Sequence, residues 1–596
     1  MTAEENEPTD DPTAVSPPPS EAETAVSPKF PWESLAVVIL ILILAVGAYF
    51  RFTGLNWDEN FHLHPDERFL TIVASQLKSV PDPLTYLKTS ESTLNPYNTG
   101  QGFYVYGNFP MTVTRYVAEW AEKLCQPFAG DGGGICGIPF TGYDGVHLLG
   151  RFLSGLLDLV SVLFIFLIGR RLYDWRVGLL ASLLLALAVM PIQQSHFFTM
   201  DNWAAGLTTL AIYTAVRAAG LGDKTAQWRL RWYALFGLAV GLALASRINL
   251  APLALIINLS ALIWLVLRGQ TWESVRHTAA GKLDLERVIL GIILAAVITI
   301  VTFRLAQPYA FADAATARDE VIATTGQEPG VIETAVRSFV GFNPQFRSNM
   351  EEIQRLQSPD ASFPPATQWT NRAPILFPWT NMVLYGMGLL AGLAAWFGFF
   401  WALWRIFQGK PDWVSHAIPV AWSGMYFLFM GTRWVKSIRY FLPIYPMLLL
   451  LGAWALFALW DRTERQKFRQ ILAGGLIATV VLFTFAWAWT FLDTYKNPVT
   501  RVAASAWMYE NIPSGATLIY KTDGVEKEYN LPLKEYGFVS GSPLTLGFPM
   551  PEDGVITAVR LNYLQTADGS DNQPVTFAAG YTDGNNVATA VALNSQ

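Results

Sequence analysis

The sequence predicts a polytopic α-helical membrane protein of about eleven transmembrane helices, followed by a mostly-β domain at the C-terminus. Its 596 residues are 52% hydrophobic and only 15% charged, against roughly 25% charged residues in a typical soluble domain. The mean hydropathy is +0.29. The net charge of −6, and the lack of a basic run interleaved with aromatic residues, argue against nucleic-acid binding.

Apolar runs of the length needed to cross a bilayer define the predicted spans. They cover residues 34–50, 146–169, 177–198, 202–220, 232–246, 248–267, 288–306, 379–404, 416–431, 440–460 and 471–491. The first run lies too far from the N-terminus, and lacks the preceding basic residues, for a cleaved signal peptide. We therefore predict that it is an uncleaved transmembrane helix.

The two ends of the chain differ in composition from the membrane domain, which is predicted over residues 31–491. Residues 1–30 are rich in Pro, Ser, Glu and Thr, which predicts a disordered tail. Residues 492–596 contain short β-rich runs separated by Asp-Gly turn signals, which predicts a mostly-β domain. These signals begin at Asp523, Asp553 and Asp583. The sequence stops directly after a strand-like run, which allows for an incomplete domain.

Lysine and arginine in the short loops predict the orientation in the membrane. They follow every second span, at Arg170, Arg171, Arg176, Lys224, Arg229, Arg231, Arg268, Arg276, Lys282, Arg287, Arg405, Lys410, Arg462, Arg465, Lys467 and Arg469. The side that carries them is expected to be cytoplasmic, together with the N-terminus. The long polar segments 51–145 and 307–378, and the C-terminal domain, are then expected on the exoplasmic side of the plasma membrane.

The only two cysteines, Cys125 and Cys136, lie in one glycine-rich stretch of the first outer segment. Two thiols alone do not make a structural zinc site. In an oxidising compartment a disulfide that closes this stretch is expected. Two free thiols are the alternative.

An acidic segment follows directly on the first span. Its acids and the histidine between them are Asp58, Glu59, His64, Asp66 and Glu67. Carboxylates close to a low-dielectric surface and to like charges have a raised pKa, which favours work as a general base. The alternative is a solvated loop whose last two acids open an amphipathic helix over residues 68–77.

A further acid lies just after the third predicted span. Asp201 is the only acid between residues 178 and 222. An N-cap of the next helix is the simple interpretation. An acid within membrane-spanning sequence is costly, however, and therefore points to a function.

Basic residues also gather on the predicted outer side, against the general trend. In chain order they are Arg247, Arg304, Arg433, Lys436 and Arg439. They imply an anionic ligand at the membrane surface, and a phosphate or diphosphate held by guanidinium groups is the simplest candidate. Snorkelling towards lipid headgroups is the alternative.

A phosphorylated lipid beside the acids satisfies both sets of residues and predicts glycosyl transfer from a lipid-phosphate donor. A carboxylate takes the acceptor proton as the anomeric carbon is attacked, and the basic residues stabilise the leaving phosphate. One base without a protein nucleophile predicts inversion at that carbon. A flippase or transporter of a lipid-linked sugar is the alternative, but the repeat symmetry and mid-bilayer polar groups of transporters are not found.

Three stretches resemble the GT-C membrane glycosyltransferases, especially the aminoarabinose-transferase and protein O-mannosyltransferase-like, phospholipid carrier-dependent group. Residues 65–69 are similar to an acidic segment after the first helix of that group, with one residue fewer before the aromatic. Residues 150–201 are similar to its second and third helices and its second acidic position. Residues 439–446 resemble its late Arg-Tyr-x-x-Pro segment. The resemblance covers roughly residues 30–490.

The resemblance implies roles for particular residues. Asp66 is the expected catalytic base, Glu67 its neighbour, and Asp201 a second acid that shapes the acceptor or sugar site. Relatives often carry a lysine in the region of residues 104–110, where this chain has Asn108 and no lysine. Phosphate contacts are therefore expected from basic residues of the outer turns. The substrate-binding candidates are Asp58, Glu59, His64, Arg68, His196, Arg247, Arg433, Lys436, Arg439 and Tyr440.

The same resemblance implies the partners. The expected donor is a polyprenyl-phosphate sugar in the lipid bilayer, and the acceptor is a protein, a lipid or a glycan. No cofactor is expected to be required. A divalent metal stays open, because mannosyltransferase-type relatives work without one and oligosaccharide-transferring relatives use one.

Overall fold

The structure is a computed structural model that describes residues 32–127, 135–223, 225–463, 466–511, 515–531, 550–561, 574–580 and 587–594. The predicted tail over residues 1–30 lies outside the described residues. So do Lys224, Arg465 and the predicted turn at Asp583.

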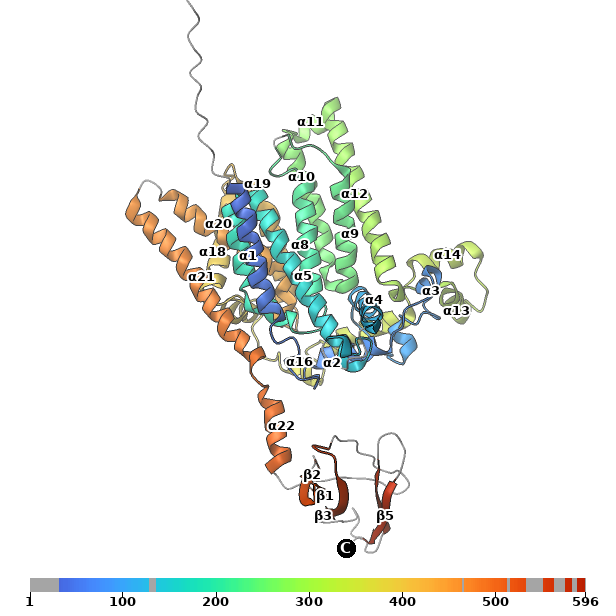
Figure 1. Cartoon of the computed structure of the whole chain (residues 1–596). Coiled ribbons are helices and arrows are strands. Elements are labelled where there is room, and N and C mark those ends of the chain that lie inside the picture. The colour runs from blue at the N-terminus through green and yellow to red at the C-terminus, as the bar shows by residue number, and fades with distance from the viewer. Residues whose placement is uncertain are drawn as a thin grey trace, which may run out of the picture.

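Helices form a tall bundle (Figure 1). Its members are α1 (Trp32–Phe52), α5 (Tyr143–Leu172), α6 (Trp175–Ala186), α7 (Val189–Ser195), α8 (Asp201–Ala218), α9 (Leu230–Ser246), η4 (Ile248–Leu255), α10 (Ile256–Leu267), α12 (Ala279–Ala306), α17 (Leu376–Asn381), η6 (Met382–Gly386), α18 (Leu389–Phe407), α19 (Trp413–Gly431), η7 (Ile438–Ile444), α20 (Tyr445–Arg462) and α21 (Lys467–Lys496). The short α11 (Trp272–His277) lies at the upper end in Figure 1.

The predicted polytopic membrane fold is confirmed, but the count of eleven spans is not. Within the described residues, seven stretches are long and apolar enough to cross a bilayer, or up to eight if the pair α6 and α7, bent by 55°, is one span. The other predicted spans correspond to α8, α9 and α19. Helix α9 has only 17 residues. Helix α8 is buried along almost its whole length and carries Asp201, Asn202 and several threonines. These polar residues are tolerated because the helix is surrounded by protein and does not need apolar side chains on all faces.

Charged side chains inside the bundle are paired. The Nε atom of Arg51, at the end of α1, donates a hydrogen bond of 2.6 Å to Asp158 on α5. Another guanidinium nitrogen of Arg51 donates to the Ala186 carbonyl, at 2.9 Å, where α6 ends. Both side chains are buried, and removing either partner would leave an unpaired charge in a medium of low dielectric. The pair therefore fixes three helices at one level.

Both long polar segments fold at the lower end of the bundle in Figure 1, opposite α11. Their helices are α2 (Pro65–Gln76), α3 (Pro83–Leu87), η1 (Pro96–Thr99), α4 (Asn108–Cys125), η3 (Ile135–Gly137), η5 (Pro308–Ala310), α13 (Ala314–Thr325), α14 (Val331–Val340), α15 (Pro344–Leu356) and α16 (Pro364–Thr367). A separate apolar core that includes Leu70, Tyr104, Met111 and Tyr309 joins the two segments. Cys125 and Cys136 form a disulfide, which agrees with the expected pairing.

The C-terminal region begins with helix rather than strand. Helix α21 runs on to Lys496 and is followed by α22 (Thr500–Asn511), because the apolar pattern weakens there without a helix breaker before Pro498. The strands are β1 (Ala516–Thr522), β2 (Val525–Asn530), β3 (Val555–Leu561), β4 (Pro574–Gly580) and β5 (Val587–Asn594).

The described strands form two antiparallel sheets, one ordered β2-β1-β3 and one that pairs β4 with β5. The predicted turn at Asp523 joins β1 to β2, with φ of 48° at Asp523 and 81° at Gly524. Positive φ at both central residues is the geometry of a tight hairpin turn, which Asp-Gly favours. The predicted β-rich region is therefore present, but it starts later than residue 492.

Candidate functional site

The two neighbouring acids of the first long polar segment open helix α2. Pro65 is its first residue, and the Nδ1 atom of the N-cap His64 accepts a hydrogen bond of 3.2 Å from the Glu67 backbone. Carboxylates are favoured in the first helical turn because the backbone N–H groups there are unpaired. Consecutive helical residues differ in direction by roughly 100°, since a turn takes 3.6 residues. Asp66 and Glu67 therefore contact different parts of the molecule.

Glu67 belongs to a buried ion cluster that we call the Arg151 network, formed by Arg151, Asp58 and Glu67. Arg151 on α5 donates to Glu67 at 2.8 and 2.7 Å. It also donates to Asp58 at 3.0 and 2.9 Å. The Phe198 backbone donates to Glu67 at 2.7 Å. All three charged side chains are fully buried, so no substrate reaches these carboxylates without displacing the network.

The pKa of Asp58 reflects this position. Burial raises the pKa of Asp58, but the hydrogen bonds and the charge of Arg151 outweigh burial and hold it below its ordinary value. The carboxylate is therefore ionised, as its bidentate pairing with a guanidinium requires. Asp58 joins the segment after α1 to α5 and does not face an open site.

Asp66 points instead towards the segment before α20. Arg439, in η7, donates a hydrogen bond of 2.5 Å to the Oδ2 atom of Asp66. Both side chains are partly open, with 31% of the Asp66 side chain and 22% of the Arg439 side chain exposed. The Tyr106 phenol is close enough to Asp66 to help lower the pKa of its carboxyl. Burial raises the pKa of Tyr106 far above its ordinary value, so the phenol keeps its proton.

The expectation that the outer acids have raised pKa values is wrong for Asp66. Burial raises the pKa of Asp66, but the charge and hydrogen bond of Arg439, with smaller contributions from His64 and Tyr106, hold it below its ordinary value. The sequence argument weighed like charges and burial and did not include a guanidinium in direct contact. As it stands, Asp66 is an ionised and weakly basic carboxylate.

Asp201 forms the second ion pair of this region. It is the first residue of α8, where no side-chain cap bond is made, and its carboxylate accepts a hydrogen bond from Arg247, which follows α9. The Arg247 guanidinium lies 4.4 Å from the centre of the Tyr440 ring, and that of Arg439 lies 5.4 Å from it. Tyr440 therefore contacts both basic side chains. We call Asp66, Asp201, Arg247, Arg439 and Tyr440 the site cluster.

His64 lies within reach of the charges of the site cluster. Burial and the charge of Arg439 lower the pKa of His64, and the charges of Asp66, Glu67 and Asp201 only partly oppose this. Its ring packs 4.4 Å from the ring of Phe197. A neutral imidazole that accepts a bond at Nδ1 carries its proton at Nε2.

The other basic candidates, Arg433 and Lys436, lie in the segment between α19 and η7 and contact residues outside the site cluster. Arg433 is exposed and stacks 4.5 Å from the centre of the Phe429 ring. Lys436 is buried, and its ammonium group donates a bond of 2.9 Å to the Trp434 carbonyl. Burial lowers the pKa of Lys436.

The remaining candidates contact backbone or solvent. Arg68 donates to the His62 carbonyl at 2.9 Å, and Glu59 is exposed with a φ of 51°. His196 is buried, with its ring nitrogens 2.9 Å from the Ile192 and Thr53 carbonyl oxygens. Its ring stacks 3.6 Å from that of Tyr495. These contacts join helices and leave His196 enclosed.

Two residues of this region, Arg151 and Tyr106, are not among the candidates predicted from the sequence. Arg151 is one of two charged residues, with Asp158, in the apolar run over residues 146–169, and such residues mark buried partners or functional sites. Its partners lie 84 and 93 residues earlier in the sequence. The charge within an apolar run could therefore be recognised from the sequence, but the residues that pair with it could not. Nothing in the sequence distinguishes Tyr106 from the other tyrosines near it.

The site cluster brings two carboxylates, two guanidinium groups and a phenol together at one end of the bundle. Among the described residues, no group of three or more His, Cys, Asp and Glu side chains could hold a metal ion. Each carboxylate is instead paired with an arginine. Such an arrangement can exchange a carboxylate partner for an anionic ligand at the guanidinium groups.

Part of the chain matches a known family. Residues 145–294 match the model described as dolichyl-phosphate-mannose-protein mannosyltransferase. The matched residues include Arg151, Asp201 and Arg247. The predicted resemblance to this family is therefore confirmed over that part of the chain. Among curated protein sequences, none matches this chain.

Solved membrane transferases are similar to this chain at low identity. The apo oligosaccharyltransferase of Archaeoglobus fulgidus is 17% identical with a TM-score of 0.45, over 80% of this chain and 58% of its own. ArnT from Cupriavidus metallidurans bound to undecaprenyl phosphate is 15% identical with a TM-score of 0.41, over 81% and 82%. The Saccharomyces cerevisiae protein O-mannosyltransferase Pmt1-Pmt2 complex bound to the sugar donor is 14% identical with a TM-score of 0.33, over 50% and 37%. This chain thus spans 58% of the length of the archaeal protein.

Proposed function

We propose that this protein is an inverting glycosyltransferase that moves a sugar from a polyprenyl-phosphate donor to an acceptor at the exoplasmic face of the membrane. The observation that carries the proposal is the direct contact of Asp66 with Arg439, beside the pair of Asp201 with Arg247. A base and a phosphate-binding group within one side-chain length are what this transfer needs. The family match over residues 145–294 supports it.

The donor phosphate is proposed to bind the guanidinium groups of Arg247 and Arg439. Both groups lie close to the Tyr440 ring, which supports the proposal that one anion beside that ring binds both. The two acids balance the charge of the two arginines before the donor arrives. A planar guanidinium binds phosphate through two parallel hydrogen bonds and keeps its charge at any physiological pH.

Donor binding would change the basicity of Asp66. Arg439 holds the pKa of the Asp66 carboxyl below its ordinary value, which makes it a poor base while the ion pair persists. A phosphate that takes the Arg439 hydrogen bond leaves Asp66 half-buried with a weaker counter-charge. Burial then raises its pKa. Asp66 becomes a better base only when the donor is in place, which couples activation to binding.

The transfer step then runs in one displacement. The acceptor hydroxyl oxygen forms a bond to the anomeric carbon as the bond from that carbon to the phosphate oxygen breaks. The hydroxyl proton passes to Asp66, and the electron pair of the broken bond stays on the lipid phosphate. Arg247 and Arg439 stabilise the negative charge that grows there, where electrostatic help is most effective. Attack from the face opposite the leaving phosphate inverts the anomeric configuration.

Lys436 and Arg433 are proposed to assist at the entry to the site. Lys436 is buried with a backbone carbonyl as its hydrogen-bond partner, so an approaching phosphate can improve its solvation. Arg433 is exposed on the same turn and is suited to attracting the anionic headgroup by long-range charge. Neither residue contacts the two acids of the site cluster in the described hydrogen bonds and ion pairs, so we assign them no part in proton transfer.

The test is a transfer assay on the detergent-purified full chain with a radiolabelled polyprenyl-phosphate sugar. Wild type is expected to release polyprenyl phosphate and to give a product with inverted configuration, read by NMR. Asp66→Asn is expected to release none above background. Glu91→Gln is the matched control, because Glu91 is an exposed acid of the same outer segment that pairs only with Lys88.

The same assay separates the transferase from a transporter. Flipping of a lipid-linked sugar moves the donor across a bilayer without breaking its phosphate bond. Transbilayer movement by wild type with no polyprenyl phosphate released, in the presence of candidate acceptors, would replace the transferase proposal by the transport alternative.

A further inference from the structure

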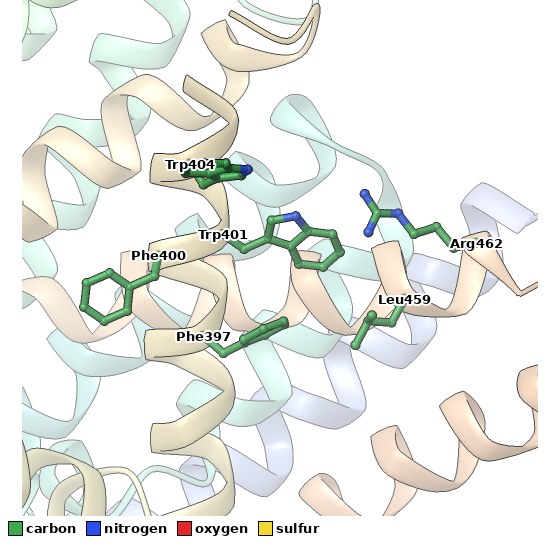
Figure 2. A pocket seen from close by; sticks show the side chains of 6 residues that line it. All are labelled: Phe397, Phe400, Trp401, Trp404, Leu459 and Arg462. Atoms are coloured by element: carbon green, nitrogen blue, oxygen red, sulfur yellow. The ribbon is translucent and has the colours of Figure 1, made fainter. Parts of the chain in front are cut away.

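A groove lies between α18 and α20 at the end of the bundle opposite the site cluster (Figure 2). Its volume is about 420 Å³, and it is lined by Phe397, Phe400, Trp401, Trp404, Leu459 and Arg462. Helix α20 starts next to η7, which carries Arg439, and ends at Arg462. Its 18 residues at 1.5 Å each separate the groove from the site cluster by roughly the thickness of a bilayer core.

The walls of the groove are apolar and open to the outside of the protein. The side chains of Phe397, Phe400 and Trp404 come from one helix, and 51%, 57% and 60% of these residues are exposed. Both α18 and α20 belong to stretches long and apolar enough to cross a bilayer. Large exposed aromatic side chains near the end of a spanning helix face lipid at the level of the headgroups. The groove is therefore continuous with the lipid-facing surface.

One positive charge stands at the mouth of this groove. The Arg462 guanidinium lies 4.4 Å from the centre of the Trp401 ring, and Figure 2 shows it beside Trp401 and above Leu459. It makes no ion pair with a carboxylate in the described part of the chain.

Two other arginines at the same end of the bundle do form ion pairs with carboxylates. Arg176 is paired with Asp461, and Arg405 is paired with Asp412. Asp461 and Asp412 are thus each engaged with another arginine, and among the described carboxylates none is paired with Arg462.

We propose that this groove binds an anionic phospholipid. One acyl chain lies along the aromatic wall from Phe397 to Trp404, a helical rise of about 10 Å. The phosphate meets Arg462, which gains a charge-assisted hydrogen bond. A water-soluble ligand would have to displace lipid from apolar walls to gain one cationic contact, whereas a phospholipid supplies an apolar chain and an anionic headgroup at the spacing of the groove. The site is separate from the transferase site and does not depend on it.

Native mass spectrometry of the detergent-purified full chain tests the proposal. Phosphatidylglycerol and phosphatidylcholine with the same acyl chains are titrated separately. Wild type is expected to bind its first phosphatidylglycerol more tightly than its first phosphatidylcholine. Arg462→Gln is expected to reduce this preference about fivefold, the loss of one arginine contact near an anionic headgroup.

Two further variants make the result specific. Lys410→Gln removes an exposed charge at the same end that does not line the groove, and it is expected to keep the preference. Phe400→Ser is expected to weaken both lipids equally, because it changes the wall and not the charge. Equal binding of the two lipids by wild type, or equal loss in Arg462→Gln and Lys410→Gln, would overturn the proposal. Thermal unfolding of each variant checks that it is folded.

Discussion

The Arg151 network and the site cluster start from adjacent residues, Glu67 and Asp66, and pair carboxylates with guanidinium groups in both cases. They differ in access. The side chains of the Arg151 network are fully buried, whereas Asp66 and Arg439 are each partly open. A fully buried ion cluster stabilises the packing of the helices that it joins. In an ion pair that is open to solvent, an anionic ligand can replace the carboxylate at the guanidinium group. One turn of helix α2 thus places a structural acid, Glu67, next to Asp66, the acid that we propose as the catalytic base.

The largest effect is expected from removing the arginine of the Arg151 network. Arg151→Met leaves Asp58 and Glu67 buried without a counter-charge, and we expect a loss of about 3–5 kcal/mol in the free energy of unfolding. Thermal unfolding in detergent, followed by tryptophan fluorescence, measures it. Arg439→Met is the matched variant. Because 31% of the Asp66 side chain is open to solvent, we expect a smaller loss, of about 2 kcal/mol, between the values for exposed and for buried pairs. Equal melting temperatures for the two variants would contradict the assignment.

Arg247→Gln tests whether the site cluster takes part in the transfer reaction. We expect the transfer rate to fall about 100- to 1,000-fold, the usual effect of losing one group that stabilises developing charge. The melting temperature should fall, because the single variant leaves the buried Asp201 carboxylate without its counter-charge, so the rate is expressed per folded molecule. Because Asp201 is almost fully buried, the double variant Arg247→Gln with Asp201→Asn serves as control for its unpaired charge. Recovery of transfer in the double variant would argue against a direct role of Arg247.

The pH dependence of the transfer rate tests the role of Asp66 in the site cluster. A base acts only when deprotonated, so activity is lost as the pH falls through the pKa of Asp66 in the protein. Arg439 holds this pKa below its ordinary value, while the neighbouring His64 and Tyr106 contribute less. In Arg439→Gln the raising effect of burial remains, so the acidic limb of the pH profile of kcat/KM for the donor, which reports the protein without donor, should move to higher pH. A limb that stays in place would remove Asp66 as the titrating base.

The smallest effect on transfer is expected from Arg433, which lies outside the site cluster. Arg433→Gln removes an exposed charge that stacks on Phe429. We expect KM for the donor to rise about fivefold or less, as for other exposed charge interactions, with kcat unchanged. The difference from wild type should shrink as salt is added, because salt screens exposed charges. A large fall in kcat would instead place Arg433 within the reacting groups.

Much of the site was predictable from residue types, and its division into two clusters was not. Asp66, Asp201, Arg247 and Arg439 stood out in the sequence because charges next to apolar runs are costly. Which acid meets which base depends on the directions of adjacent side chains on α2. It also depends on contacts such as that of Asp66 with Arg439, 373 residues apart in the sequence.

The fold shows the same limit. Hydropathy located the helices well, but it could not tell a lipid-facing helix from α8, which is enclosed by others. It also ended α21 too early, at 491 instead of Lys496. Local composition reports apolar length, whereas the number of spans depends on packing between helices.

The most direct test of the account compares Asp66→Asn with Glu67→Gln in the same transfer assay, with the rate expressed per folded molecule. We predict that Asp66→Asn melts close to wild type but loses transfer by about 100-fold or more, as expected for the loss of a general base. Glu67→Gln should melt lower and yet keep a rate per folded molecule close to that of wild type. Full transfer by Asp66→Asn, or a stable but inactive Glu67→Gln, would contradict the division of the two acids.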